Sequence, residues 1–354
     1  MDKKTLKEFI FSLCSVMSVS GFEKRAQEPV SALVDGMFDE DITDAVGNRI
    51  LIKKSSKKNA PRVLIDAHLD EIGMIVTEVC RGGFLRIANL GGIDVSIMQA
   101  SDVMVYGKET LRGVIASTPP HLKKDDKLPE PDELIVDVGV PYEKLCELVD
   151  VGTPVGFAPA YSELLGDKIA GKSFDDKACA ACAILAVATT PREQMAADAY
   201  VVLSATEETN RLGGVSAAAY RCMPDYAMVI DVNLARVPDT KDHETVEMDK
   251  GVSISISAAT DLRLSKLTAK LCDQKEIAYT TVAAPSSTGT NATTVNLVGL
   301  GIPTVDVGLP LACMHTYNEI ISLNDAMTLA TLVKEFICSE DIAEQMTREE
   351  IPFI

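Results

Sequence analysis

Residues 62–71 have the sequence Arg-Val-Leu-Ile-Asp-Ala-His-Leu-Asp-Glu. Within this stretch the short apolar run Val63–Ala67 ends in the polar side chains of His68 and Asp70. Such a run is typical of a buried strand in a parallel sheet, and open α/β sheets bind their ligands beyond the carboxyl ends of their strands. The stretch therefore predicts a central strand whose carboxyl end opens into a functional site.

The chain beyond about residue 169 alternates between strand and helix patterns. Apolar runs predict strands at 200–204, 227–230, 252–257, 277–282 and 303–307, and helical spacing predicts helices at 177–187, 215–221, 262–272 and 325–338. Two further helices are expected before the first strand, the second of them over 23–37. Alternation of this kind predicts an α/β fold, with a mostly parallel mixed sheet flanked by helices.

Between the first strand and this alternating region the residue pattern is different. Short β-rich pieces at 74–79, 84–87, 103–106, 113–116 and 134–138 are separated by glycine pairs and proline-rich turns, and 118–131 has the composition of an exposed loop. Closely spaced short strands predict a small β-barrel-like domain. We therefore expect a catalytic domain made of residues 1–72 and 166–354, interrupted by an inserted β-rich domain at 73–165.

The composition indicates which classes of binding partner and which cellular compartment to expect. The 354 residues include 34 Lys and Arg against 52 Asp and Glu, a formal net charge of −18. This charge repels phosphate backbones and anionic lipids, so we expect neither nucleic-acid nor membrane binding. The nine cysteines are an odd number in mostly apolar surroundings, which favours free thiols in a reducing compartment and a cytoplasmic protein.

Two local features have a second interpretation. The basic residues before Phe9 resemble a short signal peptide, but the spacing of Leu6, Phe9, Ile10 and Leu13 favours an amphipathic helix. Cys179 and the cysteine three residues later form a C-x-x-C pair, which we interpret as small buried side chains on a helix.

Acidic and histidine side chains follow the predicted strands repeatedly. His68 and Asp70 follow the first strand, Asp175-Asp176 opens a helix, and the remaining groups are Glu207-Glu208 after 200–204, Asp231 after 227–230 and His315 after 303–307. The carboxyl ends of parallel strands face one crevice, so these groups should gather there. Clustered carboxylates repel one another unless a cation neutralises them, and imidazole with carboxylate suits zinc, cobalt or manganese.

Each motif by itself is unspecific, since an isolated H-x-D is common and paired aspartates often begin helices. Their joint occurrence at strand ends is what indicates a metal site. These acids and histidines are more ligands than one tetrahedral zinc ion with an open position can use. Two metal ions that share a carboxylate fit the number of ligands better.

The order of the motifs resembles a known family. They are Ala67-His68-Leu69-Asp70-Glu71-Ile72-Gly73, Gly91-Gly92-Ile93-Asp94, Phe174-Asp175-Asp176-Lys177, Thr206-Glu207-Glu208, Val229-Ile230-Asp231, Gly289-Thr290-Asn291-Ala292 and Met314-His315-Thr316 followed by Glu319. In this order the chain resembles the tetrahedral aminopeptidases, which include glutamyl aminopeptidase and relatives labelled cellulase M or endoglucanase. The resemblance implies a zinc-exopeptidase-like α/β fold and a homo-oligomer, in many members a tetrahedral dodecamer assembled through the inserted domain.

The resemblance also implies a role for each site residue. His68 and Asp231 would bind one divalent metal ion, Glu208 and His315 the second, and Asp175 would bridge both. Asp70 would hold the His68 ring, and Glu207 would be the general base that takes a proton from the attacking water. The implied cofactors are two divalent ions, zinc first with cobalt or manganese as alternatives, and the implied substrates are peptides cleaved at the N-terminal residue.

Two other functions stay open at this point. A glycoside hydrolase needs two metal-free carboxylates and usually aromatic platforms, whereas this chain has no Trp and 5% aromatic residues. A catalytically silent scaffold would be expected to lack a ligand or the base, and all are present.

The chain also departs from the family pattern. Lys177 stands where Arg is more frequent, Asn291 where Asp is, and Thr209-Asn210 where Val-Gly is. We expect Asn291 to lie in a loop near the substrate, where the lost charge would affect specificity. His121 and His243 are expected at the surface.

Overall fold

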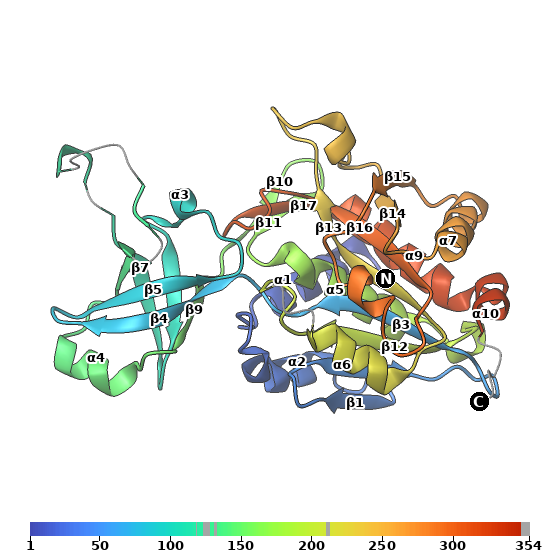
Figure 1. Cartoon of the computed structure of the whole chain (residues 1–354), viewed down its shortest axis with the longest axis horizontal. Helices are drawn as coiled ribbons and strands as arrows, with labels where there is room; N and C mark the ends of the chain where they lie inside the picture. The colour runs from blue at the N-terminus through green and yellow to red at the C-terminus, as the bar shows by residue number, and fades with distance from the viewer. Residues whose placement is uncertain (118, 123–127, 131–132, 210–212, 348–354) are drawn as a thin grey trace.

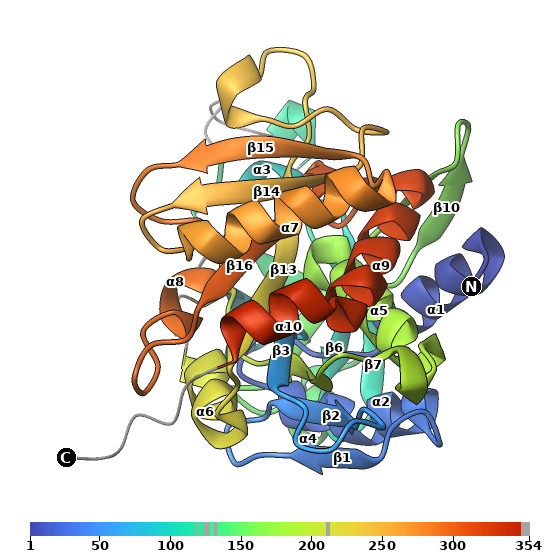
Figure 2. The same ribbon diagram turned by 90° about the vertical axis from the view of Figure 1, so that its right-hand side faces the viewer.

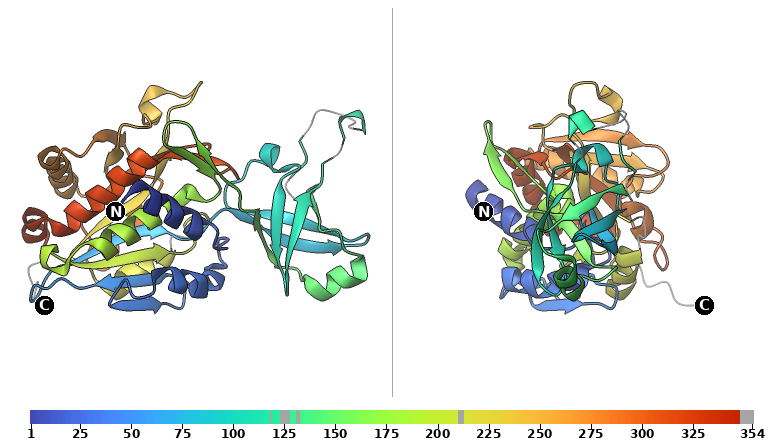
Figure 3. Two further views of the ribbon diagram at one scale, coloured as in Figure 1. Left: turned by 180° about the vertical axis from the view of Figure 1, so that it is seen from behind. Right: turned by 90° about the vertical axis from the view of Figure 1, so that its left-hand side faces the viewer.

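The structure, a computed structural model, describes residues 1–117, 119–122, 128–130, 133–209 and 213–347. It has two lobes, a larger one built on a wide sheet and a smaller β-barrel (Figure 1). The left view of Figure 3 shows the same separation from behind, and the right view looks onto the barrel with the larger lobe behind it. Among the described helices, none combines the length and the apolar character that crossing a membrane requires.

The larger lobe contains an 11-stranded mixed sheet. Its strands are β1 (Glu40–Thr43), β2 (Arg49–Lys53), β3 (Arg62–His68), β10 (Tyr161–Leu164), β11 (Lys168–Gly171), β12 (Asp198–Ser204), β13 (Tyr226–Leu234), β14 (Val252–Ser257), β15 (Tyr279–Ala284), β16 (Thr304–Ala312) and β17 (Glu319–Ser322). The main path runs β1-β2-β12-β3-β13-β16-β17-β11-β10, with β14 and β15 added beside β16. Strands β12, β3, β13 and β16 pair in parallel at the centre, and the pairs on either side of this centre are antiparallel, as is β14 with β16.

Helices cover both faces of this sheet (Figure 2). They are α1 (Lys3–Cys14), α2 (Gln27–Val34), α5 (Phe174–Thr189), α6 (Gly213–Cys222), α7 (Leu262–Lys275), α8 (Ala292–Val295), α9 (Leu323–Cys338) and α10 (Glu340–Met346). Helices α6 and α8 share one hydrophobic core with Leu64 of β3, and the other six share a second core with Val63 and Ile65. The alternation along β3 thus gives each face its own core, as a strand buried on both sides requires.

Helix α5 is buried on all sides and lies against the central strands. Its small side chains, including Cys179 and Cys182, let it approach the sheet and α9 closely. The C-x-x-C pair is therefore part of the core, and all nine cysteines are free.

The smaller lobe is a closed barrel in the order β4-β5-β8-β7-β6-β9. Its elements are β4 (Gly73–Cys80), β5 (Phe84–Leu90), α3 (Val95–Met98), β6 (Asp102–Tyr106), β7 (Thr110–Ile115), β8 (Ile135–Asp137), α4 (Tyr142–Leu148) and β9 (Pro154–Phe157). The side chains of these strands form a third core of their own. This barrel and the flanked sheet confirm the predicted α/β fold with a β-barrel-like insertion.

Several details differ from the sequence-based expectation. Residues 23–37 form a 3-10 turn, η1 (Glu23–Ala26), before α2, and not one helix. Strands β13 and β16 extend beyond their predicted ends, to Leu234 and Ala312. Of the proline-rich loop, Thr118, 123–127 and Pro131 lie outside the described residues; His121 is exposed in the turn η2 (Pro120–Leu122), and His243 in η5 (Asp242–Glu244).

Candidate metal centre

The structure brings the predicted acids and histidines together above the central strands. His68 is the last residue of β3, Glu207 and Glu208 follow β12, and His315 follows β16. Asp231 does not cap its strand as expected but lies inside β13, which continues for three more residues. Its side chain still reaches the cluster, with Asp231 Oδ1 3.9 Å from His68 Nε2.

Asp175 connects the two histidines. Its Oδ1 lies 3.1 Å from His68 Nε2, and its Oδ2 lies 3.6 Å from His315 Nε2. Glu208 Oε2 lies 3.2 Å from the same nitrogen of His315. Each imidazole therefore shares its neighbourhood with one oxygen of Asp175, which is the arrangement that a carboxylate bridging two cations requires.

The distances between these donor atoms fit metal coordination. Two ligands bound at 2.0–2.2 Å to a tetrahedral zinc ion lie about 3.3 Å apart, close to the separations observed here. Two groups could hold a cation with their donor atoms within 4.8 Å, namely His68 with Asp176 and Asp231, and His68 with Asp175 and Glu208. In addition, the buried Glu208 Oε1 has no hydrogen-bond partner among the described residues. The donor set thus fits divalent metal ions.

Electrostatics supports the same interpretation. Burial raises the pKa of Glu208 to about 7 and that of Asp231 well above its usual range. The hydrogen bond with Glu208 raises the pKa of His315 to about 9. Neighbouring carboxylates raise the pKa of both acids further, so their ionised forms repel one another in this buried site, and a divalent cation would neutralise that charge.

Asp70 contacts both the His68 ring and the backbone of the glutamate pair. Its carboxylate oxygens accept hydrogen bonds from the backbone amides of Glu207 and Glu208, each at 3.1 Å. The His68 ring instead contacts the backbone carbonyl of Asp70 through Nδ1 at 3.0 Å, while the carboxylate lies 3.6 Å away. Asp70 therefore orients the imidazole through its main chain and the glutamate pair through its side chain.

Three neighbours of the cluster were not singled out as site residues. Glu319 is buried and accepts from the backbone amides of Asp175 (3.1 Å) and His315 (3.2 Å). Asp176 accepts from the backbone amide of His68 at 3.1 Å. A Cβ on Gly92, which belongs to the loop between β5 and α3, would lie 3.0 Å from His315 Nδ1. Glu319 and Gly92 belong to the motifs that carry the family resemblance, which was the available signal.

Asn291 directly follows the loop of Thr288–Thr290 that lines the pocket, but its own side chain is buried and is not among the lining residues. Its side-chain amide donates to Asp66 Oδ2 and to Ser204 Oγ, each at 2.9 Å. Its uncharged side chain therefore matches a buried carboxylate and does not face a substrate. The pair Thr209-Asn210 also departs from the family pattern. The Thr209 hydroxyl contacts the Ser20 hydroxyl at 3.1 Å, and Asn210 lies outside the described residues.

A pocket of about 380 Å³ opens onto the centre. Gly92 from the smaller lobe lines it together with Asp175, Glu207, Glu208, Asp231, Val232, Asn233, Leu234, Thr288, Gly289, Thr290, Met314 and His315. Both lobes therefore contribute to the space that a substrate would occupy.

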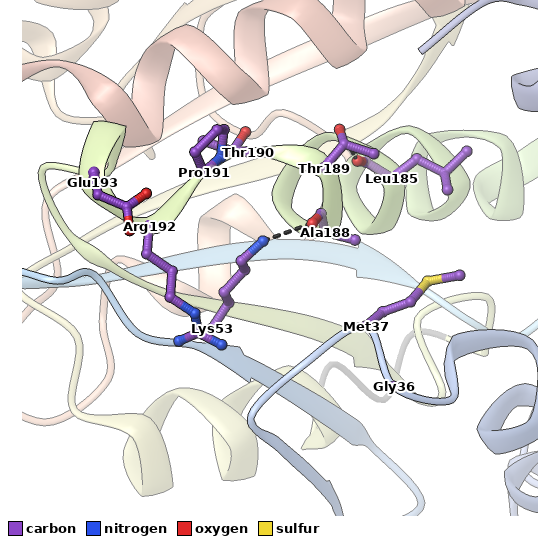
Figure 4. A pocket seen from close by; sticks show the side chains of 10 residues that line it. All are labelled: Gly36, Met37, Lys53, Leu185, Ala188, Thr189, Thr190, Pro191, Arg192 and Glu193. Carbon is purple, nitrogen blue, oxygen red and sulfur yellow. Dashed lines mark hydrogen bonds between the residues drawn. The ribbon is translucent and has the colours of Figure 1, made fainter.

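A larger pocket, of about 570 Å³, lies at the far end of α5 (Figure 4). Two of its charged side chains are already engaged, because Lys53 donates to the carbonyl of Ala188 at 2.6 Å and Arg192 forms two hydrogen bonds with Asp39. Size alone therefore does not make it the functional site, whereas the smaller pocket holds the converging acids and histidines.

Comparison with known proteins agrees with this site. Residues 47–332 match the M42 glutamyl aminopeptidase family, so the chain belongs to this family. It is 28% identical to the lysyl aminopeptidase of Pyrococcus furiosus over 345 residues, covering 95% of this chain and 97% of that protein.

Solved structures are similar over nearly the whole chain. An aminopeptidase from the archaeon Desulfurococcus kamchatkensis has a TM-score of 0.89 at 27% identity, covering 99% of both chains. The TET1 peptidase of Pyrococcus horikoshii has a TM-score of 0.82 at 26% identity, covering 94% of this chain and 99% of that one. It is described as assembling into a tetrahedron or a large octahedral shell.

Proposed function

We propose that the protein is a metal-dependent aminopeptidase whose centre holds two divalent metal ions. The observation that carries the proposal is Asp175, whose two carboxylate oxygens face His68 and His315 separately. His68 and Asp231 would hold one ion, Glu208 and His315 the other, and Asp175 both. Zinc is the first choice, with cobalt or manganese as alternatives, because imidazole and carboxylate donors suit all three.

The remaining residues do the proton chemistry. When bound, the two metal ions supply Lewis-acid activation of the scissile carbonyl and of water. The Glu207 carboxylate lines the pocket, and burial raises its pKa, so that it can take a proton from the attacking water and return it to the leaving amine. The carboxylate of Asp70 keeps Glu207 and Glu208 in place by accepting from both backbone amides.

The substrates we propose are peptides with a free N-terminus. A free amino group can bind a metal ion or donate to a carboxylate of the pocket, which a blocked or internal amide cannot do, and this would restrict cleavage to the first residue. The family match and the lysyl aminopeptidase relative support the same substrate class.

The test is hydrolysis of aminoacyl-p-nitroanilides by metal-stripped protein before and after addition of zinc, cobalt or manganese. We expect release from unblocked substrates only after metal is added, and none from the N-acetylated compounds. Absence of release with every metal and residue, on peptides as well as on nitroanilides, would contradict the proposal. The glycoside hydrolase and silent-scaffold alternatives would then be tested with glucan substrates.

We also propose a role for the barrel. The inserted domain expected at 73–165, whose barrel runs from β4 to β9, would be used in self-assembly, as the family resemblance implies. The assembly described for the TET1 peptidase supports a homo-oligomer. Light scattering after size-exclusion chromatography should give a mass several times the 38.0 kDa of one chain. The free thiols are consistent with the cytoplasmic location that we propose.

A further inference from the structure

A buried group of charged side chains lies behind the metal centre and outside the pocket. It consists of Glu71, Lys172 and Lys177, which we call the lysine cluster, and all three side chains are at most 3% exposed. Charged side chains are rarely buried unless they are paired, and such groups are retained where they hold a particular arrangement in place. None of the three is among the acids and histidines of the centre itself.

Glu71 is the hub of the cluster. Its Oε2 contacts the Lys172 ammonium and accepts from the Ser173 hydroxyl, and it lies 3.2 Å from Lys177 Nζ. Its Oε1 accepts from the backbone amide of Ser18 at 3.1 Å. One carboxylate therefore ties three separate segments of the chain together.

Lys177 extends this connection to the first helix. Its Nζ donates to the backbone carbonyl of Val16 at 2.7 Å, just after α1. Lys177 lies two residues after Asp175, in the first turn of α5. The ammonium group thus fixes the helix end that carries the bridging aspartate to the loop that follows α1.

The backbone between Lys172 and Asp175 needs such support. Ser173 has a left-handed backbone conformation, with φ of 61°, which is unfavourable for a residue with a Cβ and persists where its surroundings hold it. The Ser173 hydroxyl is held by Glu71 and contacts Lys172 Nζ at 3.0 Å. The turn directs the chain from β11 into Asp175.

We propose that the lysine cluster is a positioning device: Glu71, Lys172 and Lys177 hold the turn before α5 so that the Asp175 carboxylate faces both histidines. The inference rests on the metal-dependent function proposed above. None of the three residues touches the substrate or a metal ion; they act through Asp175. Loss of the cluster should therefore weaken the binding of both metal ions, because Asp175 serves both.

The test compares the two ends of α5. Lys177→Met removes the ammonium at the first turn, and Lys53→Met removes the buried lysine that donates to the carbonyls of Val187 and Ala188 at the last turn (Figure 4). Both changes replace a buried lysine that donates to backbone carbonyls, and only Lys177→Met also removes a partner of the Glu71 carboxylate. Lys177→Arg retains the charge and is the rescue variant. Zinc affinity is measured by competition with a chromophoric chelator, and stability by thermal unfolding of the metal-free proteins.

We expect Lys177→Met to bind both zinc ions about 10–100-fold more weakly, the range found when groups that orient metal ligands are removed. Lys53→Met should lose thermal stability but keep the wild-type zinc affinity, and Lys177→Arg should stay within a few-fold of wild type. If Lys177→Met does not fold, Glu71→Gln, which keeps the shape of the hub, takes its place in the same titration.

Three outcomes would overturn the inference. A folded Lys177→Met protein with wild-type zinc affinity contradicts it, and so does an equal loss of affinity in Lys53→Met, which would indicate a general effect of destabilising α5. Wild-type protein that binds no divalent metal would overturn the proposed function, and this inference with it. The first two outcomes leave the proposed function intact.

Discussion

Glu207 and Glu208 are adjacent in sequence but have different neighbours. Both carboxylates line the pocket, and burial raises the pKa of both, but Glu208 also contacts His315 at 3.2 Å. The backbone amides of both donate to the carboxylate of Asp70, which holds the main chain of the pair in place. The contact with His315 is the reason why we propose Glu208 as a metal ligand and Glu207 as the proton acceptor.

The first prediction concerns Glu207. Glu207→Gln keeps the size of the side chain and removes its ability to accept a proton. We expect kcat to fall by about 10²–10⁴-fold, the usual contribution of a general base, with the bound metal content unchanged. Steady-state kinetics and elemental analysis of the same preparation check this. Unchanged turnover with full metal content would show that another group is the base.

At the scale of elements, the carboxyl ends of β3 and β12 were predictable from sequence, because an apolar run that stops at a polar residue marks each of them directly. The ends of β13 and β16 were not, because both strands continue past the predicted ends. Asp231 therefore lies inside β13, with its side chain among the other buried acids and histidines. The contacts of Asn291 with Asp66 and Ser204 depend on how α8 packs on the sheet, which no local pattern records. The position of Gly92 beside His315 likewise depends on where the barrel meets the sheet.

The second prediction concerns Gly92, where the barrel meets the sheet. Gly92→Ala adds a methyl group 3.0 Å from His315 Nδ1, so the imidazole must shift by a few tenths of an ångström. We expect the metal site of His315 and Glu208 to weaken about tenfold, since small displacements of a ligand are costly, while the His68 site keeps its affinity. Zinc titration resolves the two sites. Gly213→Ala is the control, because among the described residues, apart from its chain neighbours and its own helix, no atom lies within 4 Å of the added Cβ.

A third prediction concerns β16 and the pocket loop. Asp306 is buried in β16 and accepts from Thr290 Oγ1 at 2.7 Å, and burial raises its pKa from 3.8 to about 6. The folded state therefore holds a proton that the unfolded state releases above about pH 4, so this group costs stability as the pH rises towards 6. The loss is at most about 3 kcal/mol.

Asp306→Asn should remove this part of the pH dependence. Urea denaturation of the metal-free proteins at pH 4 and pH 7 should show that the variant loses less stability than the wild type over this interval. Identical pH dependence in the two proteins would show that the buried carboxyl of Asp306 does not retain its proton.

At the scale of the whole molecule, the centre joins elements that are distant in sequence. Its residues come from β3, α5, β13 and the loops after β12 and β16, and the barrel adds Gly92. In the metal-free protein these segments bring repelling carboxylates together, so the apo fold carries an electrostatic cost. Metal ions remove this cost only in the folded state, because the unfolded chain does not hold the ligands together.

The last prediction is therefore that metal removal destabilises the entire fold. A ligand that binds only the folded state adds about 2.7 kcal/mol per site at a free concentration of 100 times its Kd. Zinc at this concentration should raise the Tm of the stripped protein by several degrees, and His315→Ala, with one site lost, should show a smaller rise. Differential scanning calorimetry with and without chelator measures both. A Tm that zinc leaves unchanged in the wild type would mean that the clustered acids and histidines do not bind it, and the repulsion among them would then need another explanation.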